Sequence, residues 1–228
     1  GLTNSIQRQG RRNPQTIQVT KMHQSVAHAY YKHHERHLHS FDWNRARQSF
    51  ETLPNKRAAR LRAIPKLIER LPNLVVLDTR VEGQKARAVL HITGLERGKD
   101  VEGGSGWYAF HAMYSARDGS VEHIELPIFV THHLVKRMMQ RLSIDDPRAA
   151  LKNLKSAVGI AIRLREPRDS EVLLVAKGGA VIGVRDQRHP KCWTFVTFVD
   201  DDKLTPGQFE EMIFWGEKAF GEGRVQCA

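Results

Sequence analysis

The chain has 228 residues, 40% of them hydrophobic, and its 36 Lys and Arg against 25 Asp and Glu give a formal net charge of +11 at pH 7. This length allows one large domain or two small ones. No apolar run is long enough to cross a bilayer, and two cysteines are too few for a disulfide framework or a four-cysteine zinc site. We therefore expect a cytoplasmic protein without membrane contact that acts on a polyanionic partner.

The first part of the chain is the most basic. Residues 1–70 hold 14 Lys and Arg against 4 Asp and Glu. The polar, aperiodic residues 1–20 predict a mobile arm, and helical spacing of apolar residues over 22–71 predicts two or three helices. We expect a basic helical module at 1–72 before an α+β domain at 73–228. The charge of this module predicts contact with an acidic partner.

Histidines are concentrated in the stretch HAYYKHHERHLH of this module. His33 and His37 have the i, i+4 spacing of a two-histidine metal clamp, but no convincing third ligand follows. The stretch therefore favours a solvated helix over a zinc site, and we expect neither a metal nor a cofactor. Tyr30, Tyr31 and Trp43 stand among basic residues and have two interpretations, stacking of nucleobases or packing in the core, of which core packing is the default.

The middle of the chain changes to a β pattern. Short strands are predicted at 74–77, 86–95, 106–116 and 118–130, with Asp118-Gly119 as a hairpin turn. A helix follows over 131–142, and a second begins with Asp146 as its N-cap and Pro147 at its first position.

Further short apolar runs predict strands at 159–166, 170–177, 180–187 and 192–200, with a tight turn at Gly178-Gly179. Thr205 and Pro206 open a last amphipathic helix. The expected fold is α+β: a basic helical N-terminal part, short strands, two helices, and an antiparallel sheet of three or four strands with a C-terminal helix. Any exposed apolar surface on that last helix would suit a homodimer or a neutralising partner.

The 131–142 helix carries an unusual row of cations. His133, Arg137 and Arg141 are spaced i, i+4, i+8, so they lie on one helix face beside a packing row of Leu134, Met138 and Leu142. One interpretation is a solvated basic face, and the other is a phosphate site that offsets the repulsion between neighbouring cations. His132 points about 100° away from His133, so it can pack or cap while His133 faces a cleft.

The pattern Thr131-x-His133-x3-Arg137-x3-Arg141, followed by a short helix and antiparallel strands, resembles bacterial ribonuclease toxins of the barnase, EndoU, colicin and RelE-like superfamily. The resemblance covers about 128–208. One departure is Leu134, where those proteins usually have alanine. The resemblance implies a toxin-like, metal-independent endoribonuclease that cleaves tRNA or another structured RNA through a 2′,3′-cyclic phosphate. The basic module at 1–72 would then either raise RNA affinity or hold an acidic antitoxin, an immunity protein or a larger host polypeptide, and the sequence leaves these open.

The last predicted strand also resembles the last core strand of these toxins, with Thr197 following Trp193. The resemblance implies that His133 transfers protons, that Arg137 and Arg141 stabilise the phosphorane, and that Thr197 orients the phosphate. Strand alternation would place Trp193, Phe195 and Thr197 on one face. Such roles agree with side-chain chemistry, because histidine titrates near neutrality and the guanidinium fork suits phosphate.

Additional RNA contacts are expected from side chains near the row or at hairpin ends, namely Thr131, His132, Lys177, Arg185, Arg188 and Lys191. Two other functions remain open. A nucleic-acid-binding protein on the same scaffold would keep the cations without a working acid and base. A metal-dependent nuclease would be sensitive to a chelator.

Overall fold

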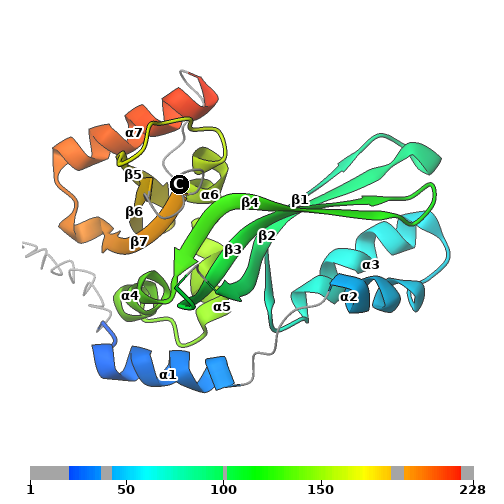
Figure 1. Cartoon of the computed structure of the whole chain (residues 1–228), viewed down its shortest axis with the longest axis horizontal. Coiled ribbons are helices and arrows are strands. Elements are labelled where there is room, and N and C mark those ends of the chain that lie inside the picture. The colour runs from blue at the N-terminus through cyan, green and yellow to red at the C-terminus, as the bar shows by residue number, and fades with distance from the viewer. Residues whose placement is uncertain (1–20, 37–42, 100–101, 186–192, 222–228) are drawn as a thin grey trace, which may run out of the picture.

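The computed structural model describes residues 21–36, 43–99, 102–185 and 193–221. Its first three helices are α1 (Gln24–Arg36), α2 (Trp43–Glu51) and α3 (Arg57–Glu69). They agree with the helices predicted over 22–71. Figure 1 shows α1 beside α4, whereas α2 and α3 lie under the far end of the long strands.

Four strands follow as an antiparallel meander. They are β1 (Leu74–Glu82), β2 (Val89–Lys99), β3 (Ser105–Ser115) and β4 (Val121–Thr131), and the short 3₁₀ helix η1 (Lys85–Arg87) joins the first two. The predicted hairpin turn at Asp118-Gly119 joins β3 to β4. Gly119 has a φ of +70°, a conformation that glycine adopts without strain.

The chain then alternates helices with a second antiparallel group of strands. In order these elements are α4 (His132–Leu142), α5 (Pro147–Leu151), η2 (Lys152–Leu154), α6 (Lys155–Ala161), β5 (Glu171–Ala176), β6 (Gly179–Arg185), β7 (Trp193–Asp200), η3 (Asp201–Lys203) and α7 (Pro206–Phe220). Asp146 and Thr205 cap α5 and α7 with their side chains, as the sequence predicts.

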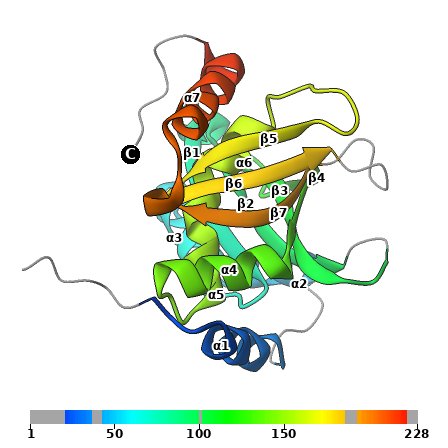
Figure 2. The same cartoon turned by 90° about the vertical axis from the view of Figure 1, so that its left-hand side faces the viewer.

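In the part of the chain that the structure describes, all the strands join in a single seven-stranded sheet, so the expected antiparallel sheet of three or four strands is wrong. Its order is β1-β2-β3-β4-β7-β6-β5. Every pairing is antiparallel except that between β4 and β7, where Ile128, Phe129 and Val130 pair with Trp193, Thr194 and Phe195. The parallel pairing arises because the chain leaves β4 through helices and returns beside it, which joins the two antiparallel groups into one mixed sheet. Figure 2 shows β7 between β6 and β4.

The strand predicted at 159–166 is also wrong, because α6 continues to Ala161 and a turn follows. The side chains of Val158, Ile160 and Ala161 are all buried. A short apolar run of this kind is compatible with a buried helix as well as with a strand, so its pattern alone does not decide between them.

The core extends over both groups of strands. Ala27 and Tyr31 of α1 belong to the same buried cluster as the packing face of α4, α6 and the central strands. A second cluster packs Ile64 and Ile68 of α3 against β2 and β3, and Met212 of α7 packs against β5 and β6. Within the described ranges, no helix combines the length and apolarity needed to cross a bilayer.

Candidate functional site

The start of α4 is fixed to the sheet by one hydroxyl. Thr131 Oγ1 accepts a hydrogen bond from the Leu134 amide at 3.2 Å and donates one to the Phe195 carbonyl at 3.1 Å. The first bond caps α4, and the second ties its beginning to β7. Thr131, expected to contact RNA, therefore has a structural function here.

The two adjacent histidines of α4 face different surroundings. His132 is half-buried, its Nδ1 lies 3.2 Å from the Ser105 carbonyl, and its ring centroid lies 6.4 Å from that of Tyr31. His133 is exposed and faces a groove between α4 and α1. The packing partner is therefore His132, and the histidine at the groove is His133.

The groove has a volume of about 460 Å³ and is lined by polar and basic side chains. These are His133, Lys136, Arg137 and Gln140 of α4, with His23, Gln24, Ser25 and His28 from the beginning of α1. The sequence singled out His133 and Arg137 but not the contribution of α1. A histidine-rich stretch was visible there, yet nothing in its spacing indicated which helix it would face.

The electrostatics of the groove favour the neutral form of His133. Partial burial, followed by the charges of Arg137, His132 and Lys136, lowers the pKa of His133. Burial and the charge of Lys32 likewise lower the pKa of Lys136, although Glu35 opposes this shift. The Lys136 ammonium lies 5.4 Å from the centroid of the Tyr31 ring. His133 is therefore unprotonated near pH 7 and able to accept a proton.

α1 is held in place by a partly buried ionic cluster at its C-terminal end. Glu35 accepts hydrogen bonds from Arg97 at 2.6 Å and from Ser105 at 2.7 Å. Burial by itself would raise the pKa of Glu35, but hydrogen bonds from Ser105, Arg97 and Lys32 lower it from 4.5 to about 2. This cluster links α1 to β2 and β3, and so fixes one wall of the groove.

Arg141 shares the helix face of His133 but not its surroundings. Its Nε lies 3.5 Å from a carboxylate oxygen of Asp200, and Lys21 pairs with the same carboxylate. Eight residues of helix separate His133 from Arg141, which is about 12 Å along the axis. Arg141 is therefore neutralised at the other end of α4, and it does not line the groove.

Thr197 lies on the opposite face of the sheet from α4. A bulge in β7 shifts its register against β6, so that Thr197 pairs with Ile182 and Phe195 pairs with Gly183. Ile182 packs in the cluster below α7, whereas Phe195 packs in the cluster of α4. The expectation that Thr197 shares a face with Trp193 and Phe195 is wrong, because the extra residue of the bulge reverses the alternation of side chains.

Of the remaining predicted RNA contacts, Lys177 and Arg185 do not line the groove. Lys177 is exposed in the β5–β6 turn, next to Gly178, which approaches Leu142 at the far end of α4. The Arg185 guanidinium lies 5.5 Å from the centroid of the Trp193 ring. Arg188 and Lys191 lie outside the described residues.

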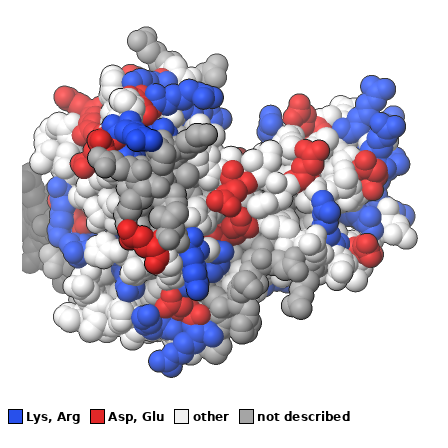
Figure 3. Space-filling model, in the orientation of Figure 1, with Lys and Arg blue, Asp and Glu red and all other residues white. Residues whose placement is uncertain are grey.

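The net charge of the chain is not displayed as a single field on the face shown in Figure 3, where basic and acidic side chains are intermixed. Within the described residues, no group of three or more His, Cys, Asp or Glu side chains is arranged to hold a metal ion.

No protein-family model, curated protein or solved structure matches the chain.

Proposed function

We propose that the α1–α4 groove binds RNA and cleaves it without a metal ion. The observation that carries this proposal is the position of His133 in a groove that also holds Lys136, Arg137 and the α1 histidine His28. The lowered pKa of His133 suits it to act as a base there. Two histidines and two cations are the side chains that transesterification at phosphate requires, a base, an acid and charge stabilisation.

In the proposed reaction, His133 takes the proton of the ribose 2′-OH while the 2′-oxygen attacks phosphorus. Arg137 and Lys136 stabilise the negative charge of the phosphorane. The bond from phosphorus to the 5′-oxygen then breaks, and His28 donates the proton that this oxygen needs. We assign the acid to His28 because the Nδ1 of His23 is already 2.8 Å from the Ser25 hydroxyl. The products are a 2′,3′-cyclic phosphate and a 5′-hydroxyl.

A second candidate, RNA binding without cleavage, is favoured by the positions of Arg141 and Thr197. Arg141 is paired with Asp200, and Thr197 lies on the other face of the sheet, so neither supports a phosphate at His133. Without Arg141 and Thr197 beside the phosphate, the groove would still bind RNA through its remaining cations but would not stabilise the phosphorane enough for cleavage.

The test incubates the protein with purified tRNA in EDTA and resolves the products on a denaturing gel, with binding measured on a native gel. We expect discrete fragments from the wild type. His133→Ala and His28→Ala should each reduce cleavage at least 100-fold, in line with the usual contribution of general acid–base catalysis, and change binding less than threefold.

His33→Ala is the matched control, because His33 is an exposed histidine of α1 that does not line the groove. It should cleave like the wild type. Intact tRNA with a shifted native band would support the binding function instead. Cleavage that survives in His133→Ala would remove the reaction from this groove.

A further inference from the structure

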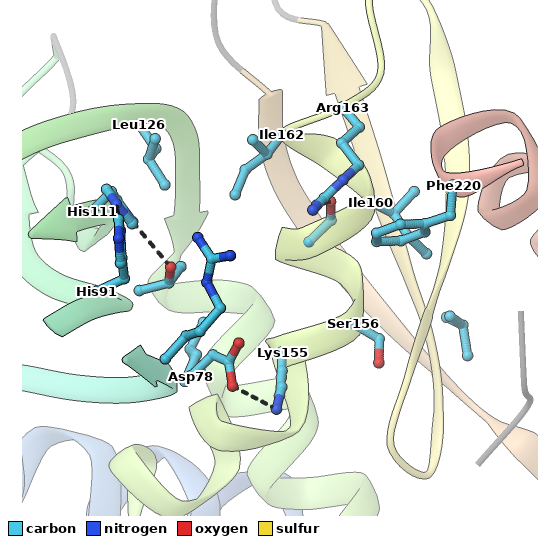
Figure 4. A pocket seen from close by; sticks show the side chains of 15 residues that line it. Asp78, His91, His111, Leu126, Lys155, Ser156, Ile160, Ile162, Arg163 and Phe220 are labelled. Carbon is cyan, nitrogen blue, oxygen red and sulfur yellow. Dashed lines mark hydrogen bonds and ion pairs between the residues drawn. The ribbon is translucent and has the colours of Figure 1, made fainter. Parts of the chain in front are cut away.

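A second cavity, separate from the groove, has a volume of about 660 Å³ and lies between α6 and the strands β1 to β4. This is within the usual range for a small-molecule site. Its apolar wall consists of Leu77, Leu126, Ile160, Ile162, Val175 and Phe220. Figure 4 shows His91 and His111 on one side of the cavity and Arg163 with Phe220 on the other.

The cavity also carries more positive than negative charge. Arg80, Lys155 and Arg163 line it, against the single carboxylate of Asp78, which pairs with Lys155 at 2.8 Å. The Arg163 guanidinium lies 4.3 Å from the centroid of the Phe220 ring and donates a hydrogen bond to the Gly159 carbonyl at 2.6 Å. This contact holds a cation beside an apolar aromatic surface, an arrangement suited to a ligand with an anionic head and an apolar body.

Four side chains form a chain of polar contacts along the β1–β3 wall, one ion pair and two hydrogen bonds. Glu82 lies 3.0 Å from His91 Nε2, His91 Nδ1 lies 3.2 Å from His111 Nε2, and His111 Nδ1 lies 3.3 Å from the Thr93 hydroxyl. With both imidazoles neutral, only one arrangement of protons satisfies every contact. His91 donates to Glu82, His111 donates to His91, and the Thr93 hydroxyl donates to His111.

A proton added to His111 would reverse the last of these bonds. Nδ1 of His111 would become a donor to the Thr93 oxygen, and the Thr93 hydroxyl would turn its hydrogen toward another acceptor. The chain therefore offers a new donor and a new positive charge together, both of which favour an anion in the cavity.

We propose that this cavity binds a small organic anion, a phosphate or carboxylate head on an apolar body, and takes up one proton at the His91–His111 pair when it does so. The head lies toward Arg163 and the Thr93 hydroxyl, and the body lies against Phe220. This site goes beyond RNA cleavage, because none of its residues lines the α1–α4 groove.

The charges around the His91–His111 pair determine whether binding of an anion is accompanied by uptake or by release of a proton. Burial, then His91 and Arg80, lowers the pKa of His111, which favours its neutral form near pH 7 without a ligand. The charged groups facing the pair are Asp78, Arg80 and Glu82 of β1, Lys155 of α6, and Arg163 in the turn after α6. β4 contributes Ile124 opposite His111, with Glu122 opposite Met113. A bound anion adds negative charge to this set and therefore raises the affinity of the pair for a proton.

The test titrates phenyl phosphate, benzoate, inorganic phosphate and uncharged phenol into the full chain at pH 7 by calorimetry. Two buffers of different ionisation enthalpy give the number of protons taken up. We expect phenyl phosphate or benzoate to bind at least tenfold more tightly than phenol, with close to one proton taken up. The affinities of phenyl phosphate and benzoate show whether the site prefers a phosphate or a carboxylate head. The difference in affinity between phenyl phosphate and inorganic phosphate gives the contribution of the apolar body.

Two variants locate the site. Arg163→Met should weaken binding at least tenfold, whereas Arg165→Met, an exposed arginine just beyond α6 that does not line the cavity, should have no effect. His111→Asn should remove the proton uptake, and its thermal unfolding will show that the fold is retained. Equal binding of phenol and the anions, equal effects of the two arginine variants, or uptake of no proton by the wild type would each overturn the proposal.

Discussion

Glu35 is the residue whose charge contributes most clearly to the stability of α1. Its folded pKa of about 2 lies below the ordinary 4.5, so its contribution is complete above that ordinary value and is lost as the pH falls toward 2. Glu35→Gln should reduce the free energy of unfolding at pH 7 by about 2 to 3 kcal/mol.

Urea denaturation of both proteins at several pH values checks this prediction. The difference between wild type and Glu35→Gln should shrink steadily from pH 5 to pH 2.5, because over that range Glu35 takes up a proton in the unfolded chain while it stays charged in the folded protein. A difference that stays constant would mean that packing, and not the charge of Glu35, stabilises this end of α1.

Thr131 offers a second test at the scale of one residue. Thr131→Ala removes both the cap of α4 and the hydrogen bond to β7, and should lower the free energy of unfolding by about 1 to 2 kcal/mol. Thr131→Ser keeps the hydroxyl and should remain within about 0.5 kcal/mol of wild type. If RNA contact were the main function of Thr131, the alanine variant would instead lose affinity at unchanged stability.

At the scale of elements, the turn between β5 and β6 is coupled to the end of α4. Gly178 has a φ of +82°, and a Cβ there would lie 2.7 Å from a methyl carbon of Leu142. Gly103 has nearly the same φ, +83°, with no atom within 4 Å of its added Cβ. Comparing alanine substitutions at these two glycines therefore separates the cost of backbone strain from the cost of the steric contact with Leu142.

Gly103→Ala should cost about 1 kcal/mol through backbone strain alone, and Gly178→Ala about 1 kcal/mol more because Leu142 must move. Urea denaturation measures both. The additional cost should disappear when Gly178→Ala is made in a Leu142→Ala background. Equal costs for the two glycines in the wild-type background would show that the turn and α4 are not coupled.

The elements that were predictable are those encoded by nearby residues. The cap at Thr205, the turn at Gly119 and the helix after Thr131 each depend on residues within a few positions, and all three are found. The parallel pairing of β4 with β7 and the bulge beside Thr197 depend on contacts between distant segments. Local patterns carry no information about such contacts, so the sheet and one face of β7 were predicted wrongly.

The same distinction applies to the candidate site. His133 and Arg137 share a helix face by spacing alone, and both line the groove. The other wall depends on how α1 docks, which the Glu35–Arg97 pair fixes across 62 positions of sequence. The contact between His91 and His111 likewise exists only because β2 and β3 pair in one register. Neither long-range arrangement has a signature in the spacing of residues.

At the scale of the whole molecule, the net charge of +11 predicts salt-sensitive binding of RNA. If about three phosphates are contacted, affinity for a single-stranded region should fall roughly 20-fold between 50 and 200 mM salt. Fluorescence anisotropy with labelled RNA measures the slope. An affinity that does not change with salt would contradict a phosphate-binding surface.

The distribution of that charge can be tested with two triple variants of equal net charge. One replaces Arg8, Arg11 and Arg12 with glutamine, and the other replaces the exposed α3 residues Arg57, Arg62 and Lys66. If the basic N-terminal segment contacts RNA, the first variant should lose about 0.7 in the salt slope for each phosphate contact removed, and the second should keep the wild-type slope. Equal losses would mean that RNA responds to the total charge of the molecule and not to this segment.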